Sequence, residues 1–369
     1  MSRRTHTNPR TGNGLTARLP GPNVLPALMG SPDPYGRQLD GMGSGISSTS
    51  KICVLAPSAD PAVADVDFTF VQVGVKDGRL DMAGNCGNMM SVVGPVALTR
   101  DLYWRRQVDV DPATGLRTVL VRILNTNTSK VVHARFQVEG GDDGTPEFSP
   151  NGSYVMDGVS GTASRINLSF INPGGAKTGR TLPTGNPVDT LTLPDGTTIE
   201  ASLVDLSNPG VFIRVADLGI PHLDTLDPPT VEADGPLKAR LEQIRQAGAS
   251  RMGLDPLTQS VPKIVLIFPP DIAQRSPGGG VDIKCLALSM GQAHKAIPLT
   301  LGLCLGAAVR LPGTIPNQLL VAAIGARESV AIGHPGGKLE VGTQMENGHV
   351  IAAELYRTAR ILMKGDVFY

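Results

Sequence analysis

The sequence predicts a β-rich α+β fold with two pseudo-symmetric domains, each a curled, mostly antiparallel sheet around a central helix. The chain has 369 residues, more than a single hydrophobic core usually serves, so two domains are expected. Its 44 Gly, 30 Pro and 4% aromatic residues favour many turns and short strands. In each half a strand leads through a polar loop into a short apolar helix, at residues 84–98 and 289–309. Such a pair of domains would bring both helix N-termini to the cleft between them, where a ligand site is expected.

Charge and cysteine content narrow the class of protein. Lys and Arg together number 33, as do Asp and Glu, so no field of one sign would recruit nucleic acid or an anionic membrane. The four cysteines are far apart and form no CxxC pair, which favours reduced thiols over a disulfide framework or a zinc site. Residues 1–14 lack the apolar core of a secretory signal, and the apolar run 297–309 is too short to span a bilayer. We therefore expect a cytoplasmic protein that binds neither nucleic acid nor membrane.

The first half begins with irregular chain and continues with strands. Residues 5–26 are rich in Gly, Pro, Asn and Thr and predict loop or disorder. Alternating residues at 68–75 predict a half-buried strand. An apolar run at 88–100 predicts a buried helix that Pro95 kinks or divides. Further strands are predicted at 52–55, 117–125, 130–139 and 166–171.

The second half is also rich in strands. Residues 236–249 form the clearest amphipathic helix, with Leu241 and Ile244 at helical spacing. A polar loop at 289–295 leads into a second apolar helix, expected at 296–308. Strands are predicted at 188–193, 199–205, 211–215, 263–268, 281–288, 329–333, 338–343, 350–358 and, as a last short one, near Val367.

The loop Gly84-Asn-Cys-Gly-Asn-Met-Met90 is the first candidate site. Cys86 lies where a helix begins, and there unpaired N–H groups and the helix dipole favour negative charge. A thiol at this position has a lowered pKa, and the surrounding backbone N–H groups can hold a carboxylate. The alternative is a Gly- and Asn-rich turn with an incidental cysteine. The predicted binding residues of this loop are Asn85, Gly87, Asn88 and Met89.

Lys51 is the second candidate. It follows Ser48, Thr49 and Ser50, whose hydroxyl groups could hold its side chain in place. Partial burial would lower the pKa of Lys51 towards use as a base. Lys51 and Cys86 on opposite sides of a carbon acid could then move a proton across it. The alternative for Lys51 is an exposed lysine at the end of a strand, the usual place for this residue.

The mouth of the second helix offers positive charge. His294 and Lys295 would suit a carboxylate there, and the equally good alternative is a helix-start histidine beside an exposed lysine. The other cysteines, Cys53, Cys285 and Cys304, lie in apolar runs and predict buried packing thiols.

Several common catalytic motifs are missing from the sequence. It has no GxxxxGK[ST], no GxGxxG after a strand, no GxSxG, no HExxH and no cluster of Cys or His with metal-ligand spacing. Nucleotide, nicotinamide, serine-hydrolase and zinc chemistry therefore lack support. We expect neither a cofactor nor a metal.

Several further motifs follow one another along the chain, and their combination is more specific than any one of them. They are Met29-Gly-Ser-Pro-Asp-Pro-Tyr-Gly-Arg-Gln-Leu-Asp-Gly41, Ser48-Thr-Ser-Lys51, Gly84-Asn-Cys-Gly-Asn88, Val93-Gly-Pro95, Asn125-Thr-Asn-Thr128, Asp157-Gly-Val-Ser-Gly161 and Gly333-His-Pro335. From about residue 29 to the C-terminus the chain thereby resembles the PrpF and methylitaconate isomerase family, which includes oxalomesaconate tautomerases and aconitate isomerases. The resemblance implies a diaminopimelate-epimerase-like fold and cofactor-independent isomerisation.

The resemblance also assigns residues and substrates. The family's active-site lysine falls on Lys51 and its cysteine on Cys86, although which of them abstracts the proton stays open. The corresponding loop of the second half holds Ser289, Met290, His294 and Lys295. The implied substrate is a small unsaturated di- or tricarboxylate such as aconitate, 2-methylaconitate, methylitaconate or 4-oxalomesaconate. The sequence is also compatible with a homodimer.

The N-terminus departs from the family pattern. Where the family has a strand with Met-Arg-Gly-Gly-Thr-Ser-Lys-Gly, this chain has only Arg10-Thr-Gly-Asn-Gly14, so residues 1–28 are expected to be a divergent loop or disordered segment. This divergence keeps open a catalytically inactive relative that acts as a binding protein. The implied fold keeps open a second alternative, an amino-acid racemase or epimerase. The expected domains are 29–185 and 186–359, with 360–369 as a candidate strand returning to the first.

Overall fold

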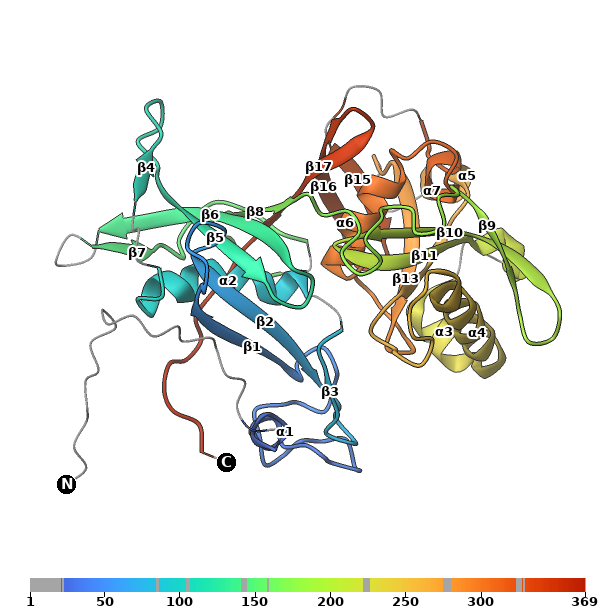
Figure 1. Cartoon of the computed structure of the whole chain (residues 1–369), viewed down its shortest axis with the longest axis horizontal. Helices are drawn as coiled ribbons and strands as arrows, with labels where there is room; N and C mark the ends of the chain where they lie inside the picture. The colour runs from blue at the N-terminus through green and yellow to red at the C-terminus, as the bar shows by residue number, and fades with distance from the viewer. Residues whose placement is uncertain are drawn as a thin grey trace.

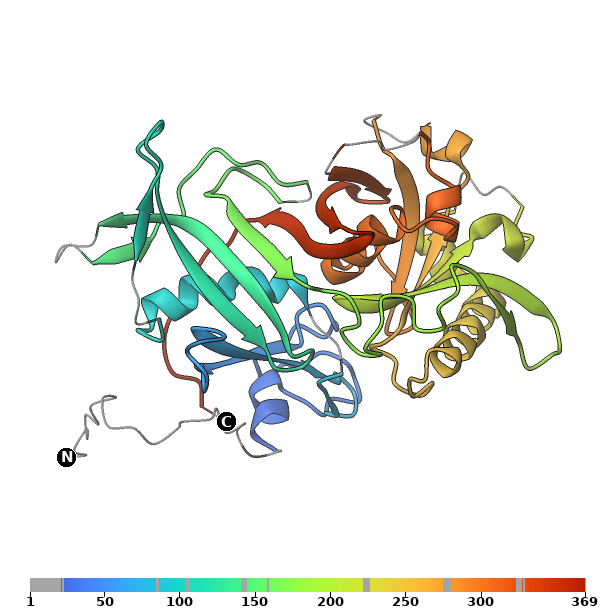
Figure 2. The same ribbon diagram turned by 45° about the horizontal axis from the view of Figure 1, so that its top comes forward.

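The computed structural model describes residues 21, 23–83, 86–103, 107–140, 145–157, 159–221, 226–274, 280–322, 327 and 329–368. These residues form two lobes that lie side by side (Figures 1 and 2). Seventeen described strands join in one hydrogen-bonded network. One helix lies at the centre of each lobe, α2 (Gly87–Thr99) in the first and α6 (Leu299–Ala308) in the second. The predicted β-rich α+β fold class is confirmed, and the domain boundary between residues 185 and 186 stays a prediction.

The sheet of the first lobe encloses α2. Its order is β1–β2–β5–β6–β8, antiparallel except for the parallel pair β2 and β5, and α2 lies between β1–β2 and β5–β6 (Figure 1). The strands predicted in this half are confirmed, with ends that differ by a few residues. The elements are α1 (Val24–Met29), β1 (Lys51–Pro57), β2 (Val66–Val73), β3 (Leu80–Asp81), α2, β4 (Val108–Val110), β5 (Arg117–Asn125), β6 (Lys130–Gly140), β7 (Pro146–Phe148) and β8 (Ile166–Ile171).

Strand β1 presents one face to α2. In its antiparallel pairing with β2, Lys51 lies opposite Gln72 and Cys53 lies opposite Phe70. Directly opposed residues share a face of a sheet. On this face the Cys53 thiol contacts the carbonyl oxygen of Met89 in α2 at 4.0 Å. The strand therefore aims Lys51 towards the N-terminal end of α2.

Helix α2 passes very close to the sheet. A Cβ on Gly94 would lie 2.7 Å from Cε1 of Phe136 and 3.1 Å from Cβ of Ala134, so this position favours glycine. The helix continues through Pro95 as one element, and the prediction that Pro95 divides it is wrong. One lost hydrogen bond does not end the helix, because packing of its apolar faces supplies most of its stability.

Helix α1 was not predicted. Its residues Leu25 and Met29 are buried against Val71 and Val73 of β2. Pro26 lies in the first turn, where its missing N–H has no helical acceptor to lose. The predicted loop at 5–26 is therefore wrong at residues 24–26. Residues 1–20 and 22 lie outside the described part of the chain.

The second lobe has the same plan with extra helices on its outer side. The predicted helix at 236–249 is confirmed as α4, which packs with α3 over a second apolar core. The elements are β9 (Asp189–Thr192), β10 (Thr198–Leu206), β11 (Asn208–Arg214), η1 (Val215–Leu218), α3 (Pro228–Ala233), α4 (Gly235–Arg251), β12 (Lys263–Ile267), α5 (Pro270–Gln274), β13 (Ile283–Ser289), β14 (Gln292–Ala293), α6, α7 (Ile315–Gln318), β15 (Ser329–His334), β16 (Gly337–Glu346) and β17 (His349–Arg357).

Helix α6 is buried along its whole length. It begins at Leu299, three residues after the predicted start at 296, because Pro298 disfavours the helical conformation in the residue before it. Within the predicted polar loop 289–295, β13 and β14 form a tight hairpin. Like α2, α6 presses glycines against its sheet: a Cβ on Gly306 would lie 2.8 Å from Cγ1 of Val341.

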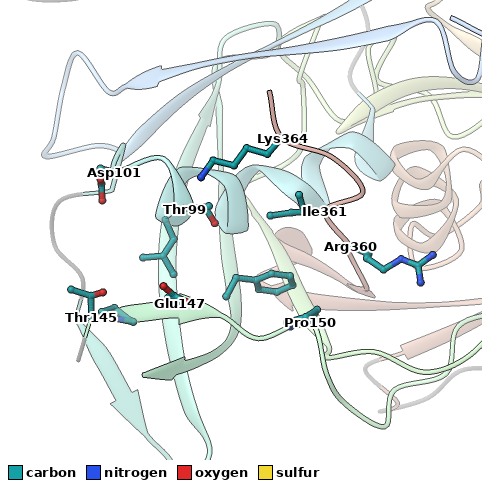
Figure 3. Close-up of a pocket in the computed structure, with 11 residues that line it drawn as sticks. Thr99, Asp101, Thr145, Glu147, Pro150, Arg360, Ile361 and Lys364 are labelled. Carbon is teal, nitrogen blue, oxygen red and sulfur yellow. The ribbon is translucent and has the colours of Figure 1, made fainter. Parts of the chain in front are cut away.

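Strand β17 belongs to both lobes. It pairs with β16 of the second lobe and with β8 of the first. The chain then returns along the first lobe (Figure 1), but residues 358–368 contain no strand, so the strand predicted near Val367 is wrong. Arg360, Ile361 and Lys364 instead line a cavity of about 410 Å³ at the end of α2 (Figure 3). The tail lies there beside the short strand β7, but no strand pairing joins the two in the described part of the chain.

Candidate active site

A cavity of about 360 Å³ lies where the N-termini of α2 and α6 meet. The two helices approach closely, since a Cβ on Gly87 would lie 2.7 Å from Cβ of Leu299. The first turn of a helix carries N–H groups with no acceptor inside the helix, and its dipole makes that end positive. The cavity is therefore suited to anions. Its polar lining residues, from both lobes, are Ser48, Lys51, Gln72, Cys86, Asn88, Ser260, Lys263, Ser289, His294, Lys295 and Thr300.

A network of amide side chains fixes the turn that leads into Lys51. Nε2 of Gln72 donates to the carbonyl oxygens of Ser47 and Ser50, each at 2.9 Å. Nε2 of Gln38 donates to Oγ of Ser50 at 2.9 Å, and Ser50 is fully buried. Lys51 therefore extends into the cavity from a well-anchored strand end.

Thr49 and Ser50 do not line the cavity. The Thr49 hydroxyl donates to the carbonyl oxygen of Ile46 at 3.1 Å and also bonds the Ser44 hydroxyl, while the Ser50 hydroxyl bonds Gln38. Successive side chains in a turn point in different directions, so of the three hydroxyl residues before Lys51 the cavity lining contains only Ser48. Thr49 and Ser50 thus shape the turn. The structure does not support the predicted contacts of these two residues with substrate.

Cys86 is the N-cap residue of α2, the position expected from the sequence. Its backbone is extended, with φ −123° and ψ 103°, and its side chain is half-buried. The thiol makes no capping hydrogen bond to the helix. Both the thiol and the N–H groups of the first turn are therefore presented to the same cavity.

The β13–β14 hairpin positions His294. Its backbone N–H donates to the carbonyl oxygen of Ala287 at 2.9 Å. Burial above all, and then the positive charges of Lys51 and Lys263, hold the pKa of His294 below its usual value. Among the described residues, its buried Nε2 has no hydrogen-bond partner. A neutral imidazole with an unpaired nitrogen is ready to bond a ligand.

Lys263 is a cavity residue that sequence reasoning missed. It opens β12, is only 7% exposed, and its Nζ donates to the carbonyl oxygen of Ser260 at 2.5 Å. Burial, assisted by the charge of Lys51, lowers the pKa of Lys263 to about 8, although Cys86 and Asp81 act in the opposite direction. The available signal was a lysine that opens an otherwise fully apolar strand. Gln72, Ser260 and Thr300 line the cavity and were also missed.

The fold brings most of the predicted site residues together. Asn85 lies outside the described residues. The predicted residues that line this single cavity are Ser48, Lys51, Cys86, Gly87, Asn88, Met89, Ser289, Met290, His294 and Lys295.

The described residues contain neither a cluster suited to a metal ion nor a helix suited to a membrane. No three side chains of the types His, Cys, Asp and Glu gather there in a way that could hold a metal ion. No helix of that part of the chain combines the length and the apolar character needed to cross a bilayer. The expected absence of metal and cofactor stays a prediction.

The relatives found by comparison with known proteins agree with one another in family and in named activity. The profile described as PrpF protein matches residues 21–369. The chain is 37% identical over 372 residues to the 2-methyl-aconitate isomerase of Shewanella oneidensis, covering 95% of this chain and 90% of that protein. It is 36% identical over 358 residues to the 3-methylitaconate isomerase of Eubacterium barkeri, covering 94% and 89%. A crystal structure of methylitaconate-delta-isomerase matches with a TM-score of 0.72 at 35% identity, covering 93% of this chain and 87% of that one.

These relatives, together with the shared fold, define the class of the protein as an isomerase. Within that class, the chain belongs to the PrpF family. The resemblance drawn from the sequence motifs is thereby confirmed.

Proposed function

We propose that this isomerase moves a proton, and with it a double bond, in a small unsaturated di- or tricarboxylate without a cofactor. The observation that carries the proposal is that Lys51 and Cys86 line one cavity at two positive helix ends. The relatives are named for 2-methyl-aconitate and 3-methylitaconate. Aconitate, 2-methylaconitate, methylitaconate and 4-oxalomesaconate are therefore the candidate substrates.

The chemistry follows from the groups around the cavity. Lys51, acting as the base, removes a proton from a carbon next to a carboxylate or an alkene, and the C–H electron pair enters the conjugated system. The N–H groups at the start of α2 and the charge of Lys263 stabilise the enediolate-like oxygens. A proton then returns to a different carbon, from the Lys51 ammonium or from the Cys86 thiol. The substrate loses one proton and gains one, and the electron pair stays in its conjugated system, so the step is a pure isomerisation. The proton on Lys51 exchanges with water, and where Cys86 is the donor, water also restores its thiol.

A racemase is the less favoured function. Two-cysteine proton exchange needs thiols on both sides of the substrate. Cys285 and Cys304 are fully buried outside the cavity lining, and burial raises the pKa of Cys285 to about 12. At the second helix the cavity is lined by Ser289 and Met290 instead. This arrangement supports the isomerase.

The proposal is tested by proton NMR of the purified protein in deuterated water, with cis-aconitate, methylitaconate and 4-oxalomesaconate as separate substrates. We expect an isomeric product that carries solvent deuterium at the carbon that exchanged its proton. The spectrum identifies the substrate class as well as the reaction. Neither turnover nor exchange with any of the three acids, from a folded sample, would point to the inactive relative.

The lowered pKa of Lys263 predicts a pH-dependent affinity for substrate. With a pKa of about 8, Lys263 is charged at pH 7 and loses its charge as the pH rises to 9. A charged lysine attracts a carboxylate and a neutral one does not, so KM is expected to rise about tenfold between pH 7 and pH 9. Steady-state kinetics across this range measure the effect.

Lys263→Met should have a raised KM at pH 7 and should lose the rise between pH 7 and 9. Lys295→Met is the matched control, because Lys295 lines the same cavity but is exposed. In that variant the rise should persist. A rise that persists in Lys263→Met would remove Lys263 from substrate binding.

The proposal also includes a cytoplasmic location, which the four free cysteines support. We also propose that the first domain spans residues 29–185 and the second residues 186–359, and that residues 360–369 return to the first domain. A homodimer is compatible with the proposal, and light scattering of the purified protein decides the oligomeric state.

A further inference from the structure

A second cavity, of about 640 Å³, adjoins the catalytic one. The walls of both contain Asn88, Lys295, Ala296, Ile297 and Leu299. The start of α2 and the segment before α6 therefore separate the two spaces by a single layer of residues. A substrate group that passes this layer leaves the catalytic cavity and enters the second one.

Arg357 is the distinctive residue of the second cavity. It ends β17, is half-buried, and its Nη2 donates to Oδ1 of Asn88 at 2.8 Å. Among the residues that the structure describes, none supplies Arg357 with a carboxylate partner. A guanidinium stays charged in proteins, and a partly buried charge without a counter-ion is unfavourable. The cavity thus holds a cation that an anionic ligand would stabilise.

The same wall holds Asp157 and Glu340 as well as Lys295 and Lys338, so with Arg357 the cations outnumber the carboxylates by one. Both carboxylates also accept hydrogen bonds from neighbouring groups. Oδ2 of Asp157 accepts the backbone N–H of Lys338 at 3.0 Å, and Oε1 of Glu340 accepts the Ser329 hydroxyl at 2.8 Å. His334 contributes a buried Nδ1 that has no hydrogen-bond partner in the described part of the chain. The second cavity therefore combines an unpaired cation with an unsatisfied polar atom.

The cations of the two cavities lie on either side of the shared wall. Lys263 and two helix ends of about half a charge each face the catalytic cavity, and Lys295 lies in the walls of both cavities. A tricarboxylate that places two carboxylates in the catalytic cavity can therefore extend its third towards a cation beyond this wall. Arg357 lies directly beyond the shared wall, bonded to Asn88.

We propose that Arg357 binds the third carboxylate of a tricarboxylate substrate, so that the second cavity selects tricarboxylates over dicarboxylates. The guanidinium fork can hold a carboxylate through two parallel hydrogen bonds. To do so it exchanges its bond to Asn88 for the substrate. This inference rests on the proposed function for the identity of the ligand.

The test measures binding of saturated acids by calorimetry, which needs no turnover. Propane-1,2,3-tricarboxylate and methylsuccinate are compared in wild type, Arg357→Gln and Arg357→Lys. Arg357→Gln is expected to weaken the tricarboxylate by about 10- to 100-fold and the dicarboxylate several-fold less, since one charged hydrogen-bonded pair is lost. Arg357→Lys keeps the charge without the fork and should fall between wild type and Arg357→Gln.

Arg165→Gln is the matched control. Arg165 lies over the ring of Tyr356, a residue of the same wall, but is exposed and outside the lining, so its loss should change neither affinity. Equal weakening of both acids by Arg357→Gln, or of neither, overturns the inference. Selective weakening in a protein that isomerises none of the candidate acids supports the second site and overturns the proposed reaction.

Discussion

Lys51→Ala is expected to lower kcat by about 10²- to 10⁴-fold, the usual contribution of a positioned general base. Lys51 opens β1 and lines the cavity, and its strand end is anchored through Ser50 by Gln72 and Gln38. These anchoring bonds do not involve the Lys51 side chain. The variant should therefore fold as wild type does while losing both turnover and solvent-deuterium exchange, as measured by proton NMR.

Lys76→Ala is the control for this experiment, because Lys76 is an exposed lysine in the same lobe, just beyond β2. It should keep full activity. Cys86→Ser separates the role of the thiol from that of the lysine, since serine retains a hydroxyl at the helix mouth but is a far weaker acid. Undiminished turnover in Lys51→Ala would remove Lys51 as the base, and undiminished turnover in Cys86→Ser would remove the thiol.

Phe136→Ala is expected to reduce the free energy of unfolding by about 3–5 kcal/mol, the typical cost of deleting a buried phenylalanine. Phe136 is 1% exposed and stacks edge-on against Phe148, with ring centroids 5.8 Å apart. The same ring packs beneath Gly94 of α2. Urea unfolding followed by circular dichroism measures the loss, and Phe136→Leu should cost distinctly less because it keeps most of the volume.

A double-mutant cycle with Gly94→Ala tests why α2 carries a glycine there. In wild type the new Cβ meets Cε1 of Phe136 at 2.7 Å, so overpacking of about 1–3 kcal/mol exceeds the gain of about 1 kcal/mol in helix propensity. In the Phe136→Ala background the ring is absent, and the cost of Gly94→Ala should largely disappear. Additive effects of the two substitutions would show that the helix does not depend on this close approach.

Local patterns were enough to predict most of the sheet. Alternation at β2, β5, β6 and β8 reflects one face buried in the core that also contains α2, and this periodicity can be read without the rest of the chain. Helix α1 and the tail after β17 could not be predicted in this way. The first forms because Leu25 and Met29 find a buried surface on β2. The second lies beside the short strand β7, and among the described residues it does not pair with it.

The candidate site was predicted where its residues form a local motif. Cys86 lies at a helix start that the sequence marks, and Lys51 follows a distinctive run of hydroxyl residues. Lys263 and Gln72 belong to ordinary strands, and they reach the cavity only through pairing and the contact between lobes. Arg357 is likewise at a strand end, next to Asn88 only after β17 has crossed between lobes. Such positions depend on tertiary contacts that one sequence does not display.

The cavity is assembled from two bodies, and this has a consequence for the reaction cycle. Lys51 and Cys86 come from the first lobe, and Lys263 and His294 from the second, with β17 as a shared strand. A small rotation about that strand would change every distance between these two sets at once. A substrate that touches both sets therefore fixes the two lobes relative to each other, and product can leave only when these contacts are broken. We expect product release, rather than proton transfer, to be the rate-limiting step of turnover.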